Sequence, residues 1–438
     1  MTAATESVIK RSVSFLFGMS TLILGANFVW LSYNTILLPT LIERVVTTNK
    51  ALVVGLLGCI GTLLGLLVTI LWGIISDHST SHWGRRSPTI LSGALLALPL
   101  IALPALFLSP ALKSFFSSLA LPIIIISFLG MQLSTNMSNG AWWPLLVDIV
   151  PEHQRGLASG IQGLLTLFGS AIGIVVVTTL NQNGYIAGSL WLVGGVFALS
   201  GAINVWAIRG KDEPAEASEP VNVWDALSDI FKVRTRIKVF FWLVLALLLA
   251  NMGVNSLQFF ARYFFQVYFP YVSPDAAFRA MGGISLVLTM LSALGAGLLS
   301  DRVGRRSMIL WSMVICAITT LLMGFTSRFT MFLVLAAIRA IAMGPILSIA
   351  PAMAGDLSPR DEAGRYMAYN NLSTGLSAAI TALIFGLLLV NMNKTTFMYL
   401  FIISAFFFLA GGILFSGKVT QTEVDVGINT IERAGELK

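Results

Sequence analysis

Three series of polar side chains recur at helical spacing inside apolar stretches of the sequence. In residues 119–147, amide or indole side chains stand at offsets of 0, 4, 7 and 11, and residues 238–268 repeat those offsets. A shorter series of the same kind lies within residues 15–41. Residues at such offsets line one face of an α-helix. The three series are Gln132, Asn136, Asn139 and Trp143; Asn251, Asn255, Gln258 and Arg262; and Asn27, Trp30 and Asn34.

The chemistry of these series favours the binding of a small hydroxylated ligand. An amide both donates and accepts hydrogen bonds, and an aromatic ring can cover the apolar face of a sugar. The alternative is that the amides only tie helices together, which contributes about 0.6 kcal/mol per pair inside a membrane. The sequence contains no nucleotide-binding loop, metal-ligand spacing or nucleophile–base pair, so neither an enzyme nor a metal site is predicted.

One arginine, Arg339, stands near the middle of the apolar stretch 330–355, close to the repeat-equivalent position of Gln132. A charged arginine at the centre of a bilayer costs about 2.5–3.5 kcal/mol on insertion scales, so it needs a partner. No acidic residue lies in the middle of an apolar stretch, because even Glu43 and Asp275 stand near the stretch ends. The predicted partner is therefore either amides and carbonyls of the protein or an anionic group on the ligand.

The composition predicts that these residues belong to membrane-spanning helices. Of the 438 residues, 56% are hydrophobic and 11% are charged, whereas about 25% of the residues of an average soluble domain are charged. Crossing a bilayer takes about 20 apolar residues. Stretches of that length recur at 15–41, 51–75, 89–109, 119–147, 156–180, 186–208, 238–268, 277–299, 308–326, 330–355, 365–390 and 396–416. The predicted fold class is all-α, a polytopic membrane protein of about 12 transmembrane helices.

The net charge of +7 is distributed unevenly over the two sides of the membrane. With both termini in the cytoplasm, the cytoplasmic segments hold most of the lysines and arginines. The opposite face holds only Arg44, Lys50, Lys113, Arg279, Arg328 and Lys394. This asymmetry follows the positive-inside rule. We therefore predict an integral protein of the plasma membrane with cytoplasmic termini and no nucleic-acid partner.

Paired loops indicate that the chain consists of two six-helix repeats. GIISDHSTSHWGRRSP at 73–88 follows the second stretch, and GLLSDRVGRRS at 297–307 follows the eighth. A D-x-x-P pattern begins at Asp148 after the fourth stretch and at Asp356 after the tenth. Internal repeats of this kind are typical of transporters. The predicted divisions are an N-terminal half at 1–208, a cytoplasmic linker at 209–237, a C-terminal half at 238–416 and a cytoplasmic tail at 417–438.

The G-x-x-S-D-R-x-G-R-R loop resembles the signature of the major facilitator superfamily, and the resemblance in topology covers nearly the whole chain. The longer insert between Asp77 and Gly84, followed by Pro88, is similar to the glycoside-pentoside-hexuronide:cation symporters and the related sucrose transporters. The resemblance implies the major facilitator fold, in which helices 1, 4, 7 and 10 line a central cavity. It also implies that both loops form a cytoplasmic latch that holds the outward-open state.

The latch residues are carboxylates, glycines and arginines at the cytoplasmic helix ends. Asp77 and Asp301 are placed to face a helix N-terminus or to pair with the arginines that follow them. Gly73 and Gly297 beside them would let a neighbouring backbone approach closely. The alternative is that the arginines only set the topology. The predicted gating residues are Gly73, Asp77, Gly84, Arg85, Arg86, Asp148 and Arg155 in the first half and Gly297, Asp301, Arg302, Gly304, Arg305, Arg306 and Asp356 in the second.

The sequence departs from the sugar:cation symporters in the residues that would bind a coupling ion. The predicted membrane core contains no carboxylate and no histidine. The end of the fourth stretch reads GAWWPLLVD at 140–148, where sucrose transporters read approximately G-P-x-R-A-L-L-A-D, so Trp143 stands in place of an arginine. No cofactor is predicted, and a coupling H⁺ or Na⁺ is left open with no site assigned.

The sequence as a whole predicts a secondary active or facilitative transporter that works by alternating access, as a monomer in a lipid bilayer. The predicted substrate is a small hydroxylated solute, such as a sugar, glycoside, uronide or related organic anion. An exporter of hydrophobic or amphipathic compounds is the main alternative, because Phe-rich and Met-rich helices supply an adaptable cavity. A membrane sensor without transport activity is a further alternative.

Overall fold

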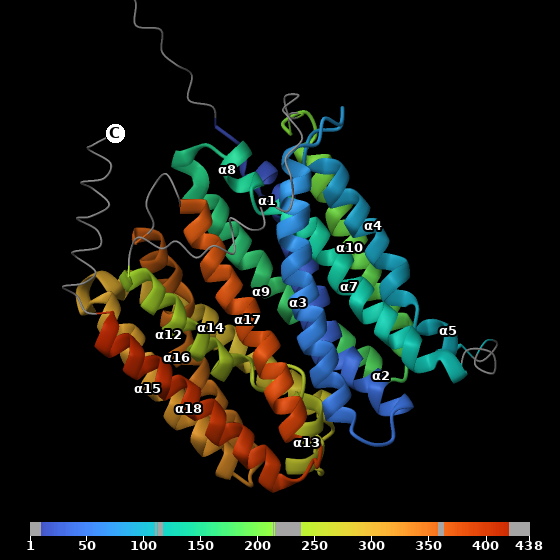
Figure 1. Cartoon of the computed structure of the whole chain (residues 1–438), viewed down its shortest axis with the longest axis vertical. Helices are drawn as coiled ribbons and strands as arrows, with labels where there is room; N and C mark the ends of the chain where they lie inside the picture. Colours follow the sequence, from blue (N-terminus) through green and yellow to red (C-terminus); the bar gives the residue numbers. More distant parts are fainter. Residues whose placement is uncertain are drawn as a thin grey trace, which may run out of the picture. The chain divides into compact units, whose positions relative to one another are not determined.

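The structure is a computed structural model that describes residues 10–109, 112, 117–212, 214, 238–357 and 363–419. The described residues are almost entirely helical (Figure 1). Among them, 12 helical segments are long and apolar enough to cross a membrane. The predicted all-α membrane fold with about 12 spans is therefore confirmed.

The first six spans come from the first half of the sequence. They contain α1 (Val13–Ser32), a π-helix (Tyr33–Leu37), α2 (Leu38–Val45), α3 (Lys50–Asp77), α4 (Ser87–Ala102), α5 (Ala105–Leu108), α7 (Ala120–Trp142), α8 (Leu145–Ile149), α9 (Arg155–Gln182) and α10 (Ile186–Ile208). Short 3₁₀ helices at Ser117–Leu119 and Glu152–Gln154 precede α7 and α9. The first span is thus α1, the π-helix and α2 in succession, because a π-helical turn interrupts its α-helical geometry.

The other six spans follow the predicted linker. They contain α12 (Lys238–Asn255), α13 (Ala261–Tyr268), α14 (Pro274–Val303), α15 (Arg305–Phe325), α16 (Phe329–Asp356), α17 (Ala363–Leu388) and α18 (Lys394–Lys418). The apolar stretch 238–268 is divided between α12 and α13 by the turn at 256–260. The prediction that its four polar residues share one helical face is therefore wrong, because the helix ends at Asn255.

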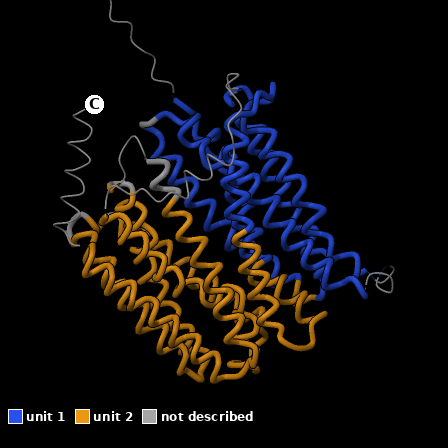
Figure 2. The backbone as a smooth tube through the Cα atoms, in the orientation of Figure 1, with its two compact units in different colours: residues 1–33, 64–180, 184–227 blue, residues 34–63, 181–183, 228–438 orange. Residues whose placement is uncertain are grey.

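The chain divides into two compact units (Figure 2). Unit 1 comprises residues 1–33, 64–180 and 184–227, and unit 2 comprises residues 34–63, 181–183 and 228–438. The predicted six-helix halves and their boundaries stay a prediction, because most of the predicted linker and the whole tail after 419 lie outside the described residues. The chain passes from unit 1 to unit 2 inside the first span and returns to unit 1 inside α3.

Unit 1 is held together by close approaches among α1, α4, α7 and α10. A Cβ atom on Gly25 would lie 2.5 Å from Oγ of Ser200, and one on Gly93 would lie 2.5 Å from Oγ of Ser138. Small residues permit such approaches between transmembrane helices. One side of α7 is therefore packed on α4, and the adjacent amide series lies on another side of the same helix.

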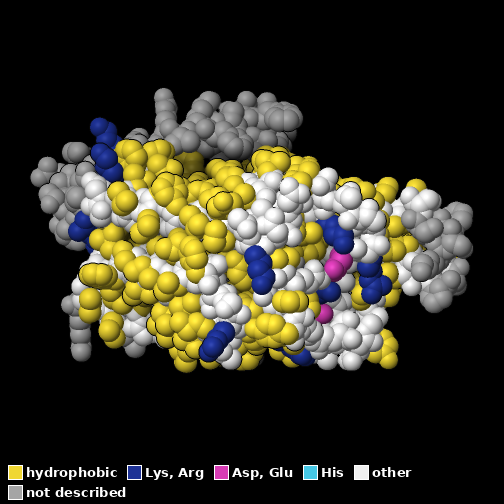
Figure 3. Space-filling model, turned by 90° about the horizontal axis from the view of Figure 1, so that it is seen from below, with side chains coloured by type: hydrophobic (Ala, Val, Ile, Leu, Met, Phe, Trp, Pro, Cys, Tyr) yellow, Lys and Arg dark blue, Asp and Glu magenta, His cyan; other side chains and the backbone are white. Residues whose placement is uncertain are grey.

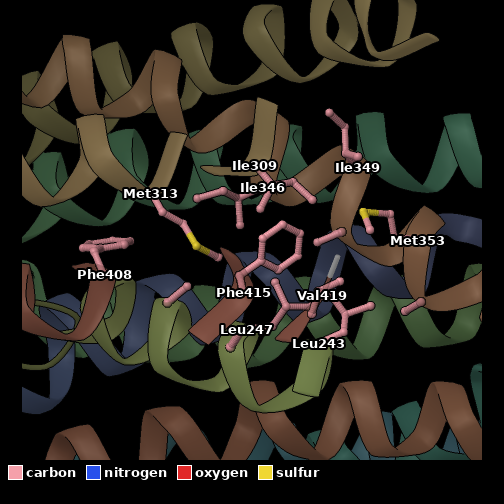
Figure 4. Packing of buried hydrophobic residues seen from close by; sticks show 14 of the residues in the cluster. Leu243, Leu247, Ile309, Met313, Ile346, Ile349, Met353, Phe408, Phe415 and Val419 are labelled. Atoms are coloured by element: carbon pink, nitrogen blue, oxygen red, sulfur yellow. The ribbon is translucent and has the colours of Figure 1, made fainter. Parts of the chain in front are cut away.

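Unit 2 has a buried apolar core formed by α12, α15, α16 and α18. Leu247, Met313, Ile346 and Phe415 are each less than 5% exposed and come from these four helices. Figure 4 shows the side chains of this core directed toward one another. This packing fixes α12 and α16, which carry several of the predicted site residues.

Large apolar side chains also lie on the surface, as expected for helices in contact with lipid. Trp206, Leu294 and Ile413 are between 60% and 75% exposed. Hydrophobic side chains cover much of the face seen in Figure 3, with a few lysines and arginines among them. An apolar surface of this extent is unfavourable in water and favourable in a bilayer.

Candidate functional site

The amides of α7 lie in unit 1, on the side of the helix that meets α3. Asn136 donates from Nδ2 to the carbonyl oxygen of Gln132 at 2.8 Å and accepts a bond at Oδ1 from Thr69 of α3 at 3.0 Å. Gln132 and Asn136 are 5% and 8% exposed. A Cβ atom on Gly65 of α3 would lie 2.7 Å from Nδ2 of Asn136. The glycine therefore makes room for this amide, and the two helices together fix its position.

Asn139 is one helical turn further along α7 and has a different environment. Its side chain is 1% exposed, and within the described part of the chain neither Oδ1 nor Nδ2 has a hydrogen-bond partner. A buried polar atom without a partner costs roughly 1–3 kcal/mol. Natural proteins retain few such atoms, and each of them calls for an explanation. A complete amide with both ends available inside a helical bundle can bind a donor and an acceptor of a ligand.

The remaining predicted residues of unit 1 are divided between buried and exposed positions. Trp30 of α1 has its indole Nε1 buried without a partner among the described residues. Asn27 donates from Nδ2 to the carbonyl oxygen of Ile23 in its own helix at 2.8 Å. Trp143 follows α7 and is 47% exposed, with its ring 5.2 Å from that of Trp142. The side chain of Trp143 is thus much more open than the amides of α7.

The predicted amides of unit 2 lie beside the turn that separates α12 from α13. Asn255, the last residue of α12, donates from Nδ2 to Oγ of Ser377 in α17 at 3.1 Å. Gln258 lies in the turn, and its Oε1 is buried without a hydrogen-bond partner in the described ranges. Asn251 is half-buried one turn before Asn255. Asn34, in the π-helix, is 5% exposed and has its Oδ1 buried and likewise unpaired among the described residues.

Arg262 lies at the centre of an ionic cluster in unit 2, the Arg262 cluster, formed by Glu43, Arg262, Gln266 and Asp275. Its Nε is 3.0 Å from Oε2 of Glu43 in α2, and its Nη1 is 3.1 Å from Oδ1 of Asp275 in α14. Gln266 donates to Oε1 of Glu43 at 2.7 Å. The side chains of Arg262 and Asp275 are 16% and 12% exposed, so this pair is largely shielded from water. Arg262 was predicted from the sequence and its partners were not, because two acids at separate helix ends give no signal of a shared arginine.

Further contacts in unit 2 join residues 34–63 and 181–183 to helices of the second half. The hydroxyl of Tyr263 donates to the carbonyl oxygen of Pro39 at 3.2 Å. Gln182 accepts at Oε1 from Arg279 at 2.9 Å. In α3, a Cβ atom on Gly55 would lie 2.5 Å from Cα of Gly386 in α17. Residues from both sequence halves are thus packed closely within this one unit.

Arg339 of α16 lies in unit 2 between three other helices. Its Nη2 is 3.4 Å from the carbonyl oxygen of Val254 in α12, and its guanidinium carbon is 5.9 Å from the centre of the Phe408 ring in α18. Cys316 of α15 contacts the carbonyl oxygen of Arg339 at 3.9 Å. The Nε atom is buried and has no hydrogen-bond partner among the described residues. A backbone carbonyl is thus among the contacts of Arg339, which was one of the two partners expected from the sequence. The binding of an anionic ligand, the other expected partner, stays a prediction.

The first repeated loop forms a second ionic cluster, the loop cluster, in unit 1. Its members are Asp77 at the end of α3, Arg85 and Arg86 in the loop, Asp148 in α8 and Asp212 after α10. Arg86 is 3% exposed and forms ion pairs with Asp77 and, at 3.1 Å, with Asp148. Arg85 is 2.7 Å from the same Asp148 oxygen. Of the two arrangements considered for Asp77, pairing with the following arginines is therefore the one present in unit 1.

Asp212 completes the loop cluster and was not predicted from the sequence. Its carboxylate accepts bonds from the backbone N–H groups of Arg86 and Ser87 at 3.0 and 2.8 Å, and from Oγ of Ser87 at 2.7 Å. It thus holds the N-terminus of α4, where a negative charge is favourable. Gly84 packs against this carboxylate with a φ of +106°, a conformation that favours glycine. The signal for this role in the sequence was an acidic residue near the start of the predicted linker.

The other predicted gating residues are placed as follows. Arg155 donates to the carbonyl oxygens of Val150 and Val147 at 3.3 and 3.2 Å. In the second loop, Arg306 donates to the carbonyl oxygens of Ser416 and Val419 at 2.7 and 2.8 Å, at the end of α18. The described residues thus place each of these two arginines near the carbonyl groups of helix ends. The side chains of Asp301, Arg302 and Asp356 lie outside the described residues.

The glycines of the two loops differ in their surroundings. A Cβ atom on Gly73 would lie 3.5 Å from the carbonyl oxygen of Gly140, which is ordinary contact. At Gly297 it would meet no described atom within 4 Å, so the expected close approach is missing there. Gly304 has a φ of +92° and precedes α15, so glycine is needed there for the backbone turn before Arg305.

Three curated proteins share part of this sequence. Sucrose transport protein SUC4 of Arabidopsis thaliana is 26% identical over 187 residues, which are 40% of this chain and 35% of that protein. The general alpha-glucoside permease of Schizosaccharomyces pombe is 26% identical over 181 residues, 39% of this chain and 31% of that protein. The membrane-associated transporter protein of Mus musculus is 27% identical over 175 residues, 38% and 32% of the two chains. Each match spans about a third of the relative's length.

Solved structures share the fold over nearly the whole chain. A bacterial homologue of the human lysosomal transporter Spinster, in an inward-facing and occupied conformation, has a TM-score of 0.71 at 14% identity, covering 94% of this chain and 97% of that one. A D-xylose–proton symporter has a TM-score of 0.65 at 15% identity, covering 90% and 96%. Similarity at this level of identity concerns the fold.

The family follows from the match to a family model. The model described as Major Facilitator Superfamily matches residues 13–295 and 257–432, which together cover most of the sequence. The match to this family indicates a transporter rather than an enzyme. The same family match explains why the paired loops resemble the superfamily signature and why 12 helical segments are long and apolar enough to cross a membrane. The chain belongs to the Major Facilitator Superfamily.

Proposed function

We propose that this protein transports a small hydroxylated solute, such as a sugar, glycoside, uronide or related organic anion, across the plasma membrane by alternating access. The observation that carries this proposal is Asn139, whose amide is buried with neither end bonded among the described residues. Gln132 and Asn136 precede it on the same helix, and Asn136 is held in position by Thr69. A row of oriented amides offers donors and acceptors to hydroxyl groups.

The similar proteins support the same class of substrate. The sucrose transport protein and the alpha-glucoside permease are named for sugars, and so is the D-xylose–proton symporter that shares the fold. An exporter of hydrophobic compounds would gain little from unbonded buried amides, since each one costs free energy unless a ligand pairs with it. We therefore favour the hydroxylated solute over the exporter.

The two ionic clusters are the proposed gates of this cycle. Both termini are proposed to be cytoplasmic, which places the loop cluster at the cytoplasmic surface and the Arg262 cluster on the outer side. Each cluster contains an arginine that bridges two carboxylates, Arg86 in one and Arg262 in the other. A bridge of this kind stabilises a closed conformation and has to break when the helices separate. The uptake experiment decides whether transport is coupled to H⁺ or Na⁺.

Uptake into proteoliposomes tests the proposal. The panel contains neutral sugars and glycosides, the corresponding uronides, and lipophilic cations, each with and without a proton or sodium gradient. We expect saturable uptake of at least one hydroxylated solute, and a gradient that drives accumulation identifies the coupling ion. Transport of the lipophilic cations alone would contradict the proposal and support the exporter.

Asn139→Ala is expected to lower uptake about tenfold or more without lowering the melting temperature. The Asn139 amide has no hydrogen-bond partner among the described residues to lose. Loss of a hydrogen bond to the ligand weakens binding, and about 1.4 kcal/mol of binding free energy corresponds to a tenfold change in affinity. The matched control is Asn204→Ala in α10, because Nδ2 of Asn204 donates to the carbonyl oxygen of Met19. That variant should lower the melting temperature and leave the KM for the solute unchanged. The opposite pattern for the two variants would assign Asn139 a packing role.

A further inference from the structure

The end of α12 inside unit 2 leaves backbone carbonyl groups that need donors. In a continuous helix the N–H of Gln258 would bond to the carbonyl oxygen of Val254, four residues before it. Here that N–H donates to the carbonyl oxygen of Asn255 at 3.1 Å. The N–H of Phe260 likewise donates to the carbonyl oxygen of Leu257 at 3.0 Å, as part of the same tight turn. The Val254 carbonyl therefore loses its usual helical donor in a region where water is scarce.

Arg339 lies at this carbonyl. Its Nη2 donates to the carbonyl oxygen of Val254 at 3.4 Å, a long hydrogen bond from a charged group. The C-terminal end of a helix carries a partial negative charge, which a nearby cation stabilises. The Phe408 ring, 5.9 Å from the guanidinium carbon, adds a second favourable contact for the cation. These contacts explain why an arginine can be retained in an apolar helix although it forms no ion pair with any described residue.

We propose that Arg339 is a positioning residue that caps the C-terminal end of α12 and so maintains the turn that separates α12 from α13. This turn directs two amides: Asn255, which bonds to Ser377 in α17, and Gln258, whose Oε1 is buried and unpaired among the described residues. The inference rests on the proposed function only in its last step, in which these two amides bind the solute. The cap itself is a property of the backbone and is open to a test without any substrate.

Hydrogen–deuterium exchange of the purified full-length protein in nanodiscs provides that test. Peptides covering 254–261 are compared in the parent protein, Arg339→Gln, Arg339→Lys and Arg328→Gln. Arg328 is an exposed arginine just before the same helix, so its variant controls for the loss of one charge. We expect exchange in 254–261 to become about tenfold faster in Arg339→Gln, with less change in Arg339→Lys, because lysine keeps the charge and a donor. The melting temperature and exchange in α18 serve as the measure of the overall fold.

Unchanged exchange in 254–261 of a folded Arg339→Gln protein would overturn the proposal. If Arg339→Gln does not fold, Arg339→Lys supplies the comparison, because its shorter reach should still accelerate exchange in this segment by a smaller factor. Equal acceleration throughout the protein would indicate a general packing role and would also contradict a local cap.

Uptake of a matched pair of solutes separates positioning from direct binding. A positioning role predicts that Arg339→Gln raises the KM for a neutral glycoside and for its uronide by similar factors, because Asn255 and Gln258 serve both. Loss confined to the uronide, with exchange unchanged, would show that Arg339 binds the carboxylate and would overturn the cap. If the parent protein transports no member of the solute panel, the proposed function fails while the exchange result still decides the cap.

Discussion

Arg86→Ala is expected to lower the free energy of unfolding by about 3 kcal/mol and to abolish uptake, whereas Arg85→Ala should change the free energy of unfolding by about 0–1 kcal/mol. Arg86 is 3% exposed, pairs with Asp77 and Asp148, and donates to Oγ of Ser76 at 2.9 Å. Removal of the Arg86 side chain leaves Asp77 and Asp148 close together without the buried cation that pairs with both. Among the described residues Arg85 pairs with Asp148 alone, and its side chain is 32% exposed, so water replaces it at little cost.

The two neighbouring arginines make this comparison sharp, because both substitutions remove one positive charge from the same loop. Thermal unfolding in detergent gives the stability of each variant, and uptake into proteoliposomes gives its activity. If topology alone determined the role of these arginines, the two variants would behave alike in both measurements. A similar melting temperature for both variants would therefore refute the assignment of Arg86 as the centre of the loop cluster.

Arg262→Gln is expected to increase the accessibility of the outer side by at least about tenfold, as measured by labelling of a reporter cysteine. The substitution leaves Glu43 and Asp275 facing each other without the arginine between them, and like charges in a shielded site repel. Thr35→Cys is a suitable reporter, because Thr35 is 3% exposed and lines a small pocket beside Arg262 and Asp275. A hydrophilic maleimide added from outside should therefore react faster in the Arg262→Gln background.

The control for this measurement is Arg44→Gln, which removes an exposed arginine next to Glu43 in α2. Its labelling rate should match that of the Thr35→Cys parent. The double variant Glu43→Gln with Arg262→Gln removes one carboxylate together with the arginine, so it should restore part of the slow labelling. Equal labelling rates in all four backgrounds would mean that the Arg262 cluster does not control access from outside.

The spans and the family could be predicted because they depend on features local to the sequence. Apolar length determines whether a helix can cross a bilayer, and the repeated loops are contiguous patterns. The ion pairing of Asp77 with Arg86 was also one of the two arrangements anticipated, since both residues belong to the same repeated loop. Local patterns and membrane topology were sufficient for each of these conclusions.

The end of α12 could not be predicted from the same features. Residues 238–268 form one apolar stretch, and no proline or glycine occurs in the turn at 256–260. The turn is stabilised by groups far away in the sequence, with Arg339 at Val254 and Ser377 at Asn255. Helical offsets assume a continuous helix, so they placed Gln258 and Arg262 on a common face with Asn251. In the structure Arg262 belongs to α13 and contacts Glu43 and Asp275 instead.

The composition of unit 2 has a consequence for fragments of this protein. Cleavage in the predicted linker would produce an N-terminal fragment that carries residues 34–63 and a C-terminal fragment that lacks them. The C-terminal fragment would lose Glu43, the partner of Arg262, and Gly55, the residue packed on Gly386. Co-expressed fragments should therefore stabilise each other against proteolysis, and the C-terminal fragment produced alone should be degraded more rapidly than the same fragment in the pair.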